Sequence, residues 1–166
     1  MFCYQCEETA KGTGCTVAGV CGKDSRTAGL QDVLLYTVKG LSMYAHRAYK
    51  LGVRDREVDV FTVEALFSTV TNVNFDYERI RDLVYRARDL RDKARGMYET
   101  ACKENRANPE VLEGPAVFIP AGDIDGLLKQ AEQISVDKRM EERGADVVGL
   151  EAVSYTHLRA HETRHD

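Results

Sequence analysis

The chain has 166 residues, of which 43% are hydrophobic and 30% charged, and its 23 basic and 27 acidic side chains give a net charge of −4. This balance is typical of a globular protein and excludes a disordered chain. The sequence contains no apolar run of the roughly 20 residues that a membrane-spanning helix needs, and its first residues lack a secretory signal. We therefore expect a cytoplasmic protein that binds neither nucleic acid nor a membrane.

The first 25 residues hold four of the five cysteines, Cys3, Cys6, Cys15 and Cys21, together with four glycines, Gly12, Gly14, Gly19 and Gly22. A glycine inside a helix costs about 1 kcal/mol relative to alanine, so this density argues against a helix. In a reducing compartment, five cysteines are metal ligands or thiols more often than disulfide partners. Residues 1–25 are therefore predicted to form a loop around a bound group.

Two helices are predicted next. Apolar residues recur at helical spacing from Thr27, and Gly52 is placed to end this first helix. A second candidate runs from Asp55, which can cap it, to about Val70. Its β-branched residues also allow a strand, but the Glu-Ala-Leu-Phe run at 64–67 favours a helix.

A long third helix is predicted to begin after Asp76, which can cap it. On one side it carries an apolar stripe, made of Tyr77, Ile80, Leu83, Val84, Ala87, Leu90, Ala94, Met97 and Ala101. On the other side, acidic residues precede basic ones by four positions, as in Asp82 and Arg86 or Asp89 and Lys93, which indicates a solvated face with ion pairs inside the helix. Cys102 lies on the apolar side and is interpreted as a buried small hydrophobe.

Beyond this helix, the chain is predicted to be extended and then helical again. The segment 108–121 holds all three prolines, Pro109, Pro115 and Pro120. Proline ends a helix and favours an extended chain. Asp123 can then cap a shorter helix to about Ile134, and 136–143 adds a further turn or two. The fold class is all-α, with a three-helix bundle within residues 26–145.

The last residues differ from the rest of the chain. Residues 148–153 resemble 28–33, so 146–153 are predicted to start a second, truncated bundle. Residues 154–166 lack an apolar stripe and are predicted to be a disordered or non-native tail. A helical tail would place His157, His161 and His165 on one face, where they could bind a metal, but we favour the first interpretation. The fourth histidine, His46, is interpreted as a helix-surface residue.

The cysteines follow the pattern C-x2-C-x8-C-x5-C. Four thiolates brought together repel one another unless a metal centre compensates their charge. Structural zinc sites usually use two compact chelating pairs, whereas here only Cys3 and Cys6 form such a pair. The unequal gaps and the glycine-rich loop favour an iron–sulfur cluster over zinc. Thiols without a metal remain a third alternative.

The residues that carry this pattern resemble a known family. The segment 1–23 reads MFCYQCEETAKGTGCTVAGVCGK, which closely resembles the amino terminus of the hybrid-cluster proteins, also called prismane proteins or hydroxylamine reductases. The similarity continues through LYTVKGL at 35–41 and EALFSTVTNVNFD at 64–76. It covers essentially residues 1–153.

The resemblance implies a cofactor and a fold. In the family, the first four cysteines hold an iron–sulfur cluster, which places a [4Fe–4S] cubane on Cys3, Cys6, Cys15 and Cys21 because the short spacing resembles the cubane subgroup. The amino-terminal domain of the family is helical and consists of two three-helix bundles. A catalytic hybrid iron–sulfur–oxygen cluster lies in later domains, and the ligand motifs of those domains do not occur in this chain.

The functional expectation follows from the resemblance. The full-length family reduces hydroxylamine to ammonia and water. This chain is similar to an amino-terminal fragment that relays electrons from an electron-donor reductase to the hybrid cluster of missing carboxy-terminal catalytic domains. No catalytic residue is assigned within it. The alternative is a non-catalytic binding module, a helical bundle stapled by zinc or by a cluster, which docks on a partner chain.

Overall fold

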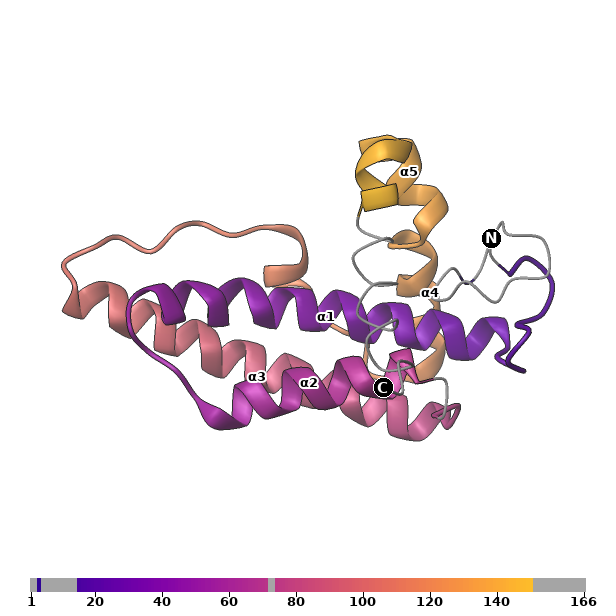
Figure 1. Cartoon of the computed structure of the whole chain (residues 1–166), viewed down its shortest axis with the longest axis horizontal. Helices are drawn as coiled ribbons and strands as arrows, with labels where there is room; N and C mark the ends of the chain where they lie inside the picture. Colours follow the sequence, from indigo (N-terminus) through magenta and orange to yellow (C-terminus); the bar gives the residue numbers. More distant parts are fainter. Residues whose placement is uncertain (1–2, 4–14, 72–73, 151–166) are drawn as a thin grey trace, which may run out of the picture.

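The structure is a computed structural model that describes residue 3 and residues 15–71 and 74–150 (Figure 1). Its helices are α1 (Ser25–Lys50), α2 (Arg56–Val70), α3 (Tyr77–Glu104), the short 3₁₀ helix η1 (Gly114–Val117), α4 (Ile124–Gln133) and α5 (Val136–Arg143). Within these described ranges the chain forms no strand beyond one isolated bridge between Cys3 and Cys15. The prediction of an all-α fold is confirmed. Cys6 and residues 151–166, with the three histidines of the predicted tail, lie outside the described residues.

The helix starts follow from capping side chains. The carboxylates of Asp55, Asp76 and Asp123 accept hydrogen bonds from backbone N–H groups in the first turns of α2, α3 and α4, as predicted. The first helix begins two residues before Thr27, because Asp24 is its cap and accepts from the Thr27 N–H at 2.7 Å. Gly52, with φ of +83°, lies just beyond the end of α1.

The strand alternative for residues 56–70 is wrong, because this segment is the α-helix α2. Val58, Phe61 and Ala65 recur at helical spacing and are 2%, 0% and 1% exposed, so burial outweighs the β propensity of the segment. The hydroxyl of Thr62 donates to the carbonyl of Val58 at 2.8 Å, which accommodates this polar β-branched residue within the helix.

The three long helices lie side by side, with α1 and α3 running in one direction and α2 in the other (Figure 1). This is the predicted bundle. Leu30, Leu34 and Leu41 of α1 are fully buried in a core that they share with Phe61 of α2 and Val84 of α3. Each fully buried side chain of this size contributes about 1.5–3 kcal/mol through the hydrophobic effect, which makes this core the main source of stability.

The charged face of α3 differs from its prediction. Arg86 pairs with Glu64 of α2 at 3.1 Å, and Lys93 pairs with Asp55 at 2.7 Å and with Glu57 at 2.9 Å. These two basic residues therefore reach away from α3 instead of pairing with Asp82 and Asp89. Such exposed pairs contribute only about 0–1 kcal/mol each, but together they fix one side of α2 against α3. Ion pairs inside the helix do occur elsewhere on this face, between Arg81 and Glu78 at 2.6 Å and between Arg95 and Glu99 at 2.7 Å.

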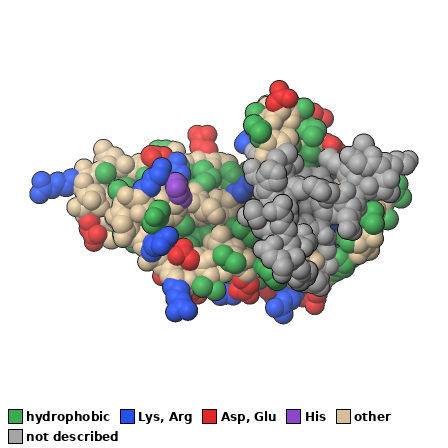
Figure 2. All heavy atoms as spheres, in the orientation of Figure 1, with side chains coloured by type: hydrophobic (Ala, Val, Ile, Leu, Met, Phe, Trp, Pro, Cys, Tyr) green, Lys and Arg blue, Asp and Glu red, His purple; other side chains and the backbone are tan. Residues whose placement is uncertain are grey.

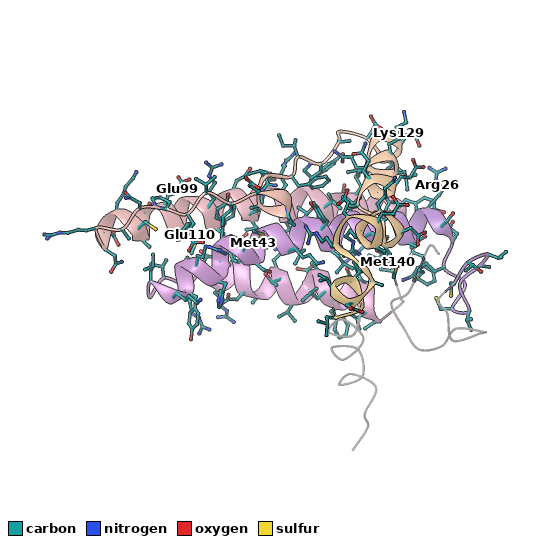
Figure 3. All side chains as sticks on the ribbon, turned by 90° about the horizontal axis from the view of Figure 1, so that it is seen from above. Arg26, Met43, Glu99, Glu110, Lys129 and Met140 are labelled. Carbon is teal, nitrogen blue, oxygen red and sulfur yellow. The ribbon has the colours of Figure 1, made fainter. Side chains whose placement is uncertain are left out.

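The proline-containing connection between α3 and α4 runs back along the bundle, as Figures 1 and 3 show. Arg47 of α1 ties it down by an ion pair with Glu110 at 2.7 Å while also donating to the carbonyl of Met43 at 3.1 Å. Farther along, the carbonyl of Pro115 lies so close to Gly40 of α1 that a β-carbon there would clash with it. The extended connection is thus held by specific contacts with α1.

The last described helices lie at one end of the bundle. Leu127 and Ala131 of α4 are buried against the core, and a β-carbon at Gly29 of α1 would lie 3.3 Å from the Ala131 side chain. Residues 145–150 are also helical, so the first part of the segment predicted to begin a second bundle forms a helix. None of the helices in the described ranges is long and apolar enough to cross a bilayer.

Candidate metal centre

Two of the four predicted ligands lie opposite each other. Cys3 and Cys15 form an antiparallel bridge in which the Cys15 N–H donates to the Cys3 carbonyl at 2.7 Å, and the Cys3 N–H donates to the Cys15 carbonyl at 3.4 Å. Side chains of such a directly opposed pair lie on one face, with β-carbons about 4.5–5.5 Å apart.

This pair of cysteines is buried against the first turn of α1. Cys3 and Cys15 are each 8% exposed and form a small apolar cluster with Ala28, which is 1% exposed. Ala28 lies in the first turn of α1, the helix that follows the cysteine loop. Burial limits the access of water to these two residues, and soft thiolates in such surroundings suit iron–sulfur or zinc ligation.

Cys21, the predicted ligand nearest α1, lies in a tight turn and is exposed. The Gly22 N–H donates to the Gly19 carbonyl at 2.9 Å, and the Gly19 N–H donates to the Lys23 carbonyl at 3.0 Å. Gly22 has φ of +87°, and a β-carbon at Gly19 would lie 2.7 Å from the Lys23 oxygen. The turn therefore requires glycine at both positions, which is the local reason for two of the four glycines in this region.

The turn is joined to the bundle through Asp24. Besides capping α1, the Asp24 carboxylate accepts a short hydrogen bond from the hydroxyl of Tyr77, the first residue of α3. These two hydrogen bonds lower the pKa of Asp24, with the Tyr77 bond as the larger cause, and the same bond raises the pKa of Tyr77. Arg26 lies over the Tyr77 ring at 5.4 Å and pairs with Asp125 of α4 at 3.6 Å, at the end of the bundle where Figure 3 labels it.

Charges of both signs lie at this end of the molecule, where the carboxylates of Asp24 and Asp76 cap α1 and α3. Because α1 and α3 run in the same direction, both amino termini lie at the end that carries the cysteine loop (Figure 1). The amino terminus of a helix bears a partial positive charge. Lys23, two residues after Cys21, adds a formal positive charge and is 1% exposed.

The structure brings Cys3 and Cys15 together and leaves the rest of the predicted ligand set open. Among residues 3, 15–71 and 74–150, no three Cys, His, Asp or Glu side chains gather closely enough to hold a metal ion. Cys6 lies outside these residues. Ligation by Cys3, Cys6, Cys15 and Cys21 therefore stays a prediction. Its donor chemistry fits an iron–sulfur cluster at the two positions that the structure pairs.

Two residues that were not assigned to the site have the surroundings expected of them. Cys102 is 2% exposed within α3, as expected for a small core residue. His46 is exposed on α1, and Figure 2 shows a histidine at the surface of the helical body.

Sequence reasoning missed the residues that hold the loop in place. Asp24 precedes a helical segment and has a side chain typical of caps, so its role in α1 could have been predicted. Its bond with Tyr77 spans 53 positions, and no local pattern signals such a contact. Burial of Lys23 was not predictable either, since lysine is almost never fully buried unless it is paired.

Comparison with known proteins identifies the family. The family model described as Prismane/CO dehydrogenase family matches residues 1–163. The chain belongs to this family. It is 45% identical over 151 residues to a hydroxylamine reductase of Rhodospirillum rubrum, and 45% identical over 157 residues to one of Acidithiobacillus ferrooxidans. A third relative, the hydroxylamine reductase of Geobacter sulfurreducens, is 47% identical over 132 residues.

This prismane-family chain matches the amino-terminal portion of these relatives. The first two alignments cover 91% and 92% of this chain but only 28% of each relative, and the third covers 78% of this chain and 24% of the relative. The resemblance predicted from residues 1–23 is therefore confirmed. Membership of the prismane family implies iron–sulfur clusters.

Proposed function

We propose that Cys3, Cys6, Cys15 and Cys21 hold a [4Fe–4S] cluster and that this part of the protein relays electrons. The proposal is supported by the pairing of Cys3 with Cys15, whose backbones bond to each other and whose side chains are buried together on Ala28. A cluster bound there would take up and release one electron at a time. The four cysteines would supply its ligands.

The surrounding residues have roles that do not depend on the redox step itself. Gly19 and Gly22 shape the turn that carries Cys21, and their N–H groups bond to carbonyl groups inside this turn. Asp24 and Tyr77 fix the position of this turn relative to α1 and α3. The carboxylates of Asp24 and Asp76 occupy the amino termini of α1 and α3, so these two helix ends hold the capping side chains and not the cluster.

In a full-length protein, the electrons would serve the reduction of hydroxylamine. That reaction consumes two electrons and two protons for each hydroxylamine, breaks the N–O bond and yields ammonia and water. We propose an electron-donor reductase as the source of the electrons and a hybrid cluster in the carboxy-terminal catalytic domains as their destination. We also propose the cytoplasm as the compartment, because reducing conditions keep cysteines available as ligands.

Anaerobic reconstitution with iron and sulfide tests the cluster directly. We expect a brown protein with broad absorption near ~400 nm and about four iron atoms per chain, as a cubane requires. A colourless protein that binds one zinc ion would instead support the zinc-stapled module. Cys15→Ser should lose most of the iron, whereas Cys102→Ser, which changes a buried cysteine in α3, should retain it. Equal iron contents in the two variants would contradict the assignment of Cys15.

A dye-oxidation assay separates an electron relay from a complete enzyme. With a reduced dye as electron donor, the reconstituted chain should transfer electrons to an added one-electron acceptor but should not consume hydroxylamine. The expectation rests on the 28% share of the relatives that this chain covers. Sustained hydroxylamine consumption would show that the catalytic site lies within these residues. Failure to reduce the acceptor, with the cluster intact, would favour the non-catalytic binding module.

A further inference from the structure

The helix α2 is apolar on two opposite faces. Its inner face places Val58, Phe61 and Ala65 in the core of the bundle. On the outer side, Val60, Val63 and Phe67 are spaced by three and four residues and are 55%, 65% and 51% exposed. This spacing puts the three side chains on one stripe, about half a turn away from the buried face. We call Val60, Val63 and Phe67 the outer stripe of α2.

A surface helix of a globular protein normally has a polar outer face, whereas a helix that is apolar all round is buried between two layers. The bundle supplies only the inner layer. On the flank towards α3, α2 is fixed by the ion pairs of Glu64 with Arg86 and of Glu57 with Lys93, and Arg86 also lies 4.8 Å from the centre of the Phe61 ring. The outer stripe is therefore held in a fixed orientation, pointing away from α1 and α3.

We propose that the outer stripe of α2 is an internal docking face, which in the full-length protein packs against the region that follows the matched amino-terminal portion. The relatives extend well beyond that portion, since the aligned residues make up only 28% of their length. A region on the same chain has a high effective concentration and needs little contact area to dock. The inference does not depend on a bound cluster.

The charges of α2 add one feature to the expected docking surface. Of the three acidic residues of the helix, Glu57 and Glu64 already pair with Lys93 and Arg86 of α3, whereas Asp59 is exposed at the edge of the outer stripe. The docking surface is therefore expected to be apolar at its centre, with a basic side chain opposite Asp59.

The small extent of the outer stripe argues against a second copy of this chain as the occupant. Three half-exposed side chains fall well short of the roughly 800 Å² per partner that a stable interface between separate chains buries.

Hydroxyl-radical footprinting with mass spectrometry measures the exposure of Phe67 directly. The isolated chain is compared with a chimera in which residues 1–150 replace the matching portion of the Rhodospirillum rubrum relative. We expect oxidation of Phe67 to fall at least about fivefold in the chimera, as for a residue in an interface core. Tyr49 is the matched control, because it is 52% exposed against 51% for Phe67 but lies on α1. Its oxidation should change less than about twofold.

Three results would overturn the proposal. Phe67 could be oxidised equally in the chain and the chimera, which would leave the stripe open to solvent. It could instead be protected in the isolated chain in a concentration-dependent way, which would identify a second copy as the occupant. Protection of Phe67 in the isolated chain at every concentration would show that this chain already covers the stripe.

A pair of substitutions provides a second readout. Val63→Asp and Val111→Asp replace valines that are 65% and 91% exposed, so both should leave the thermal midpoint of the isolated chain within about 3 °C. In the chimera, only Val63→Asp should lower the midpoint, because it places a charge in an apolar interface. Equal midpoints for the two chimeric variants would contradict the proposal. The test can also be made in the Rhodospirillum rubrum protein itself, with aspartate at the position aligned with Val63. In that form it does not depend on whether the chimera folds.

Discussion

The helical body and the cysteine loop acquire their order in different ways. In α1, α2 and α3, apolar side chains such as Leu34, Phe61 and Val84 are fully buried, and hydrophobic burial accounts for the arrangement. In the described part of the loop, order comes from one backbone bridge, a glycine turn and the Asp24 carboxylate. The order of the body does not depend on a bound group, whereas a loop of this kind gains most of its stability when a ligand joins its thiols.

Removal of a core ring should have the largest effect on the body. Phe61→Ala is expected to lower the free energy of unfolding by about 3–5 kcal/mol, because the ring is 0% exposed and leaves a cavity. Urea denaturation followed by circular dichroism measures this loss. Phe67→Ala is the matched control on the same helix and should change the stability of the isolated chain by less than about 0.5 kcal/mol. Similar losses for the two variants would contradict the assignment of inner and outer faces.

The contact between α1 and the proline-containing connection should give the next largest effect. Gly40→Ala would push a β-carbon against the Pro115 carbonyl, so we expect a loss of about 1–3 kcal/mol in unfolding free energy. Gly96→Ala in α3 is the control, because a β-carbon there meets nothing within 4 Å. Alanine at that position should stabilise the chain by up to about 1 kcal/mol, since it favours the helix. A stable Gly40→Ala variant would show that the connection can move away from α1.

A substitution in the loop should separate cluster binding from folding. Gly19→Ala places a β-carbon 2.7 Å from the Lys23 carbonyl and distorts the turn that carries Cys21. We expect the helical content and the urea midpoint to stay near those of the unaltered protein, while the iron bound after reconstitution falls. Iron analysis and circular dichroism on the same sample check both statements. Unfolding of the helices by this change would contradict the separation between body and loop.

The smallest effect is expected at the bond between Asp24 and Tyr77. Tyr77→Phe removes the larger cause of the lowered pKa of Asp24, so this pKa should rise towards its ordinary value of 3.8. A carboxylate with a lowered pKa stabilises the fold above its ordinary pKa, and this contribution disappears as the pH falls through the folded-state value. The stability difference between the two proteins should therefore be present at neutral pH and shrink in acid. Titration of the Asp24 carboxyl by NMR measures the shift, and an unchanged pKa would contradict the hydrogen bond.

Local chemistry made the helices predictable from the sequence. Asp55, Asp76 and Asp123 are caps whose partners lie within three residues, so sequence spacing alone locates the starts of α2, α3 and α4. The same locality misled the interpretation of Arg86 and Lys93, because an acid four residues earlier satisfies the pattern of an intrahelical pair. Their actual partners, on α2, become near neighbours only when the helices pack.

The candidate site was predictable in composition but not in geometry. The cysteine spacing indicates a metal centre, yet only the structure shows that Cys3 lies opposite Cys15. Likewise, the valines of α2 suggested a strand, and their real significance is that both faces of one helix are apolar. For the cysteines, the missing information is a contact between residues distant in sequence, which periodicity does not encode. For α2, the spacing of the valines was visible in the sequence, but only the burial of one face and the exposure of the other give it meaning.

The bond from Asp24 to Tyr77 also bears on the order of maturation. It joins the end of the cysteine loop to the first residue of α3, so this contact forms only once the starts of the first and third helices have met. Folding of the helices before metal insertion would therefore hold Cys21 closer to its final position and reduce the ordering that the cluster itself has to supply.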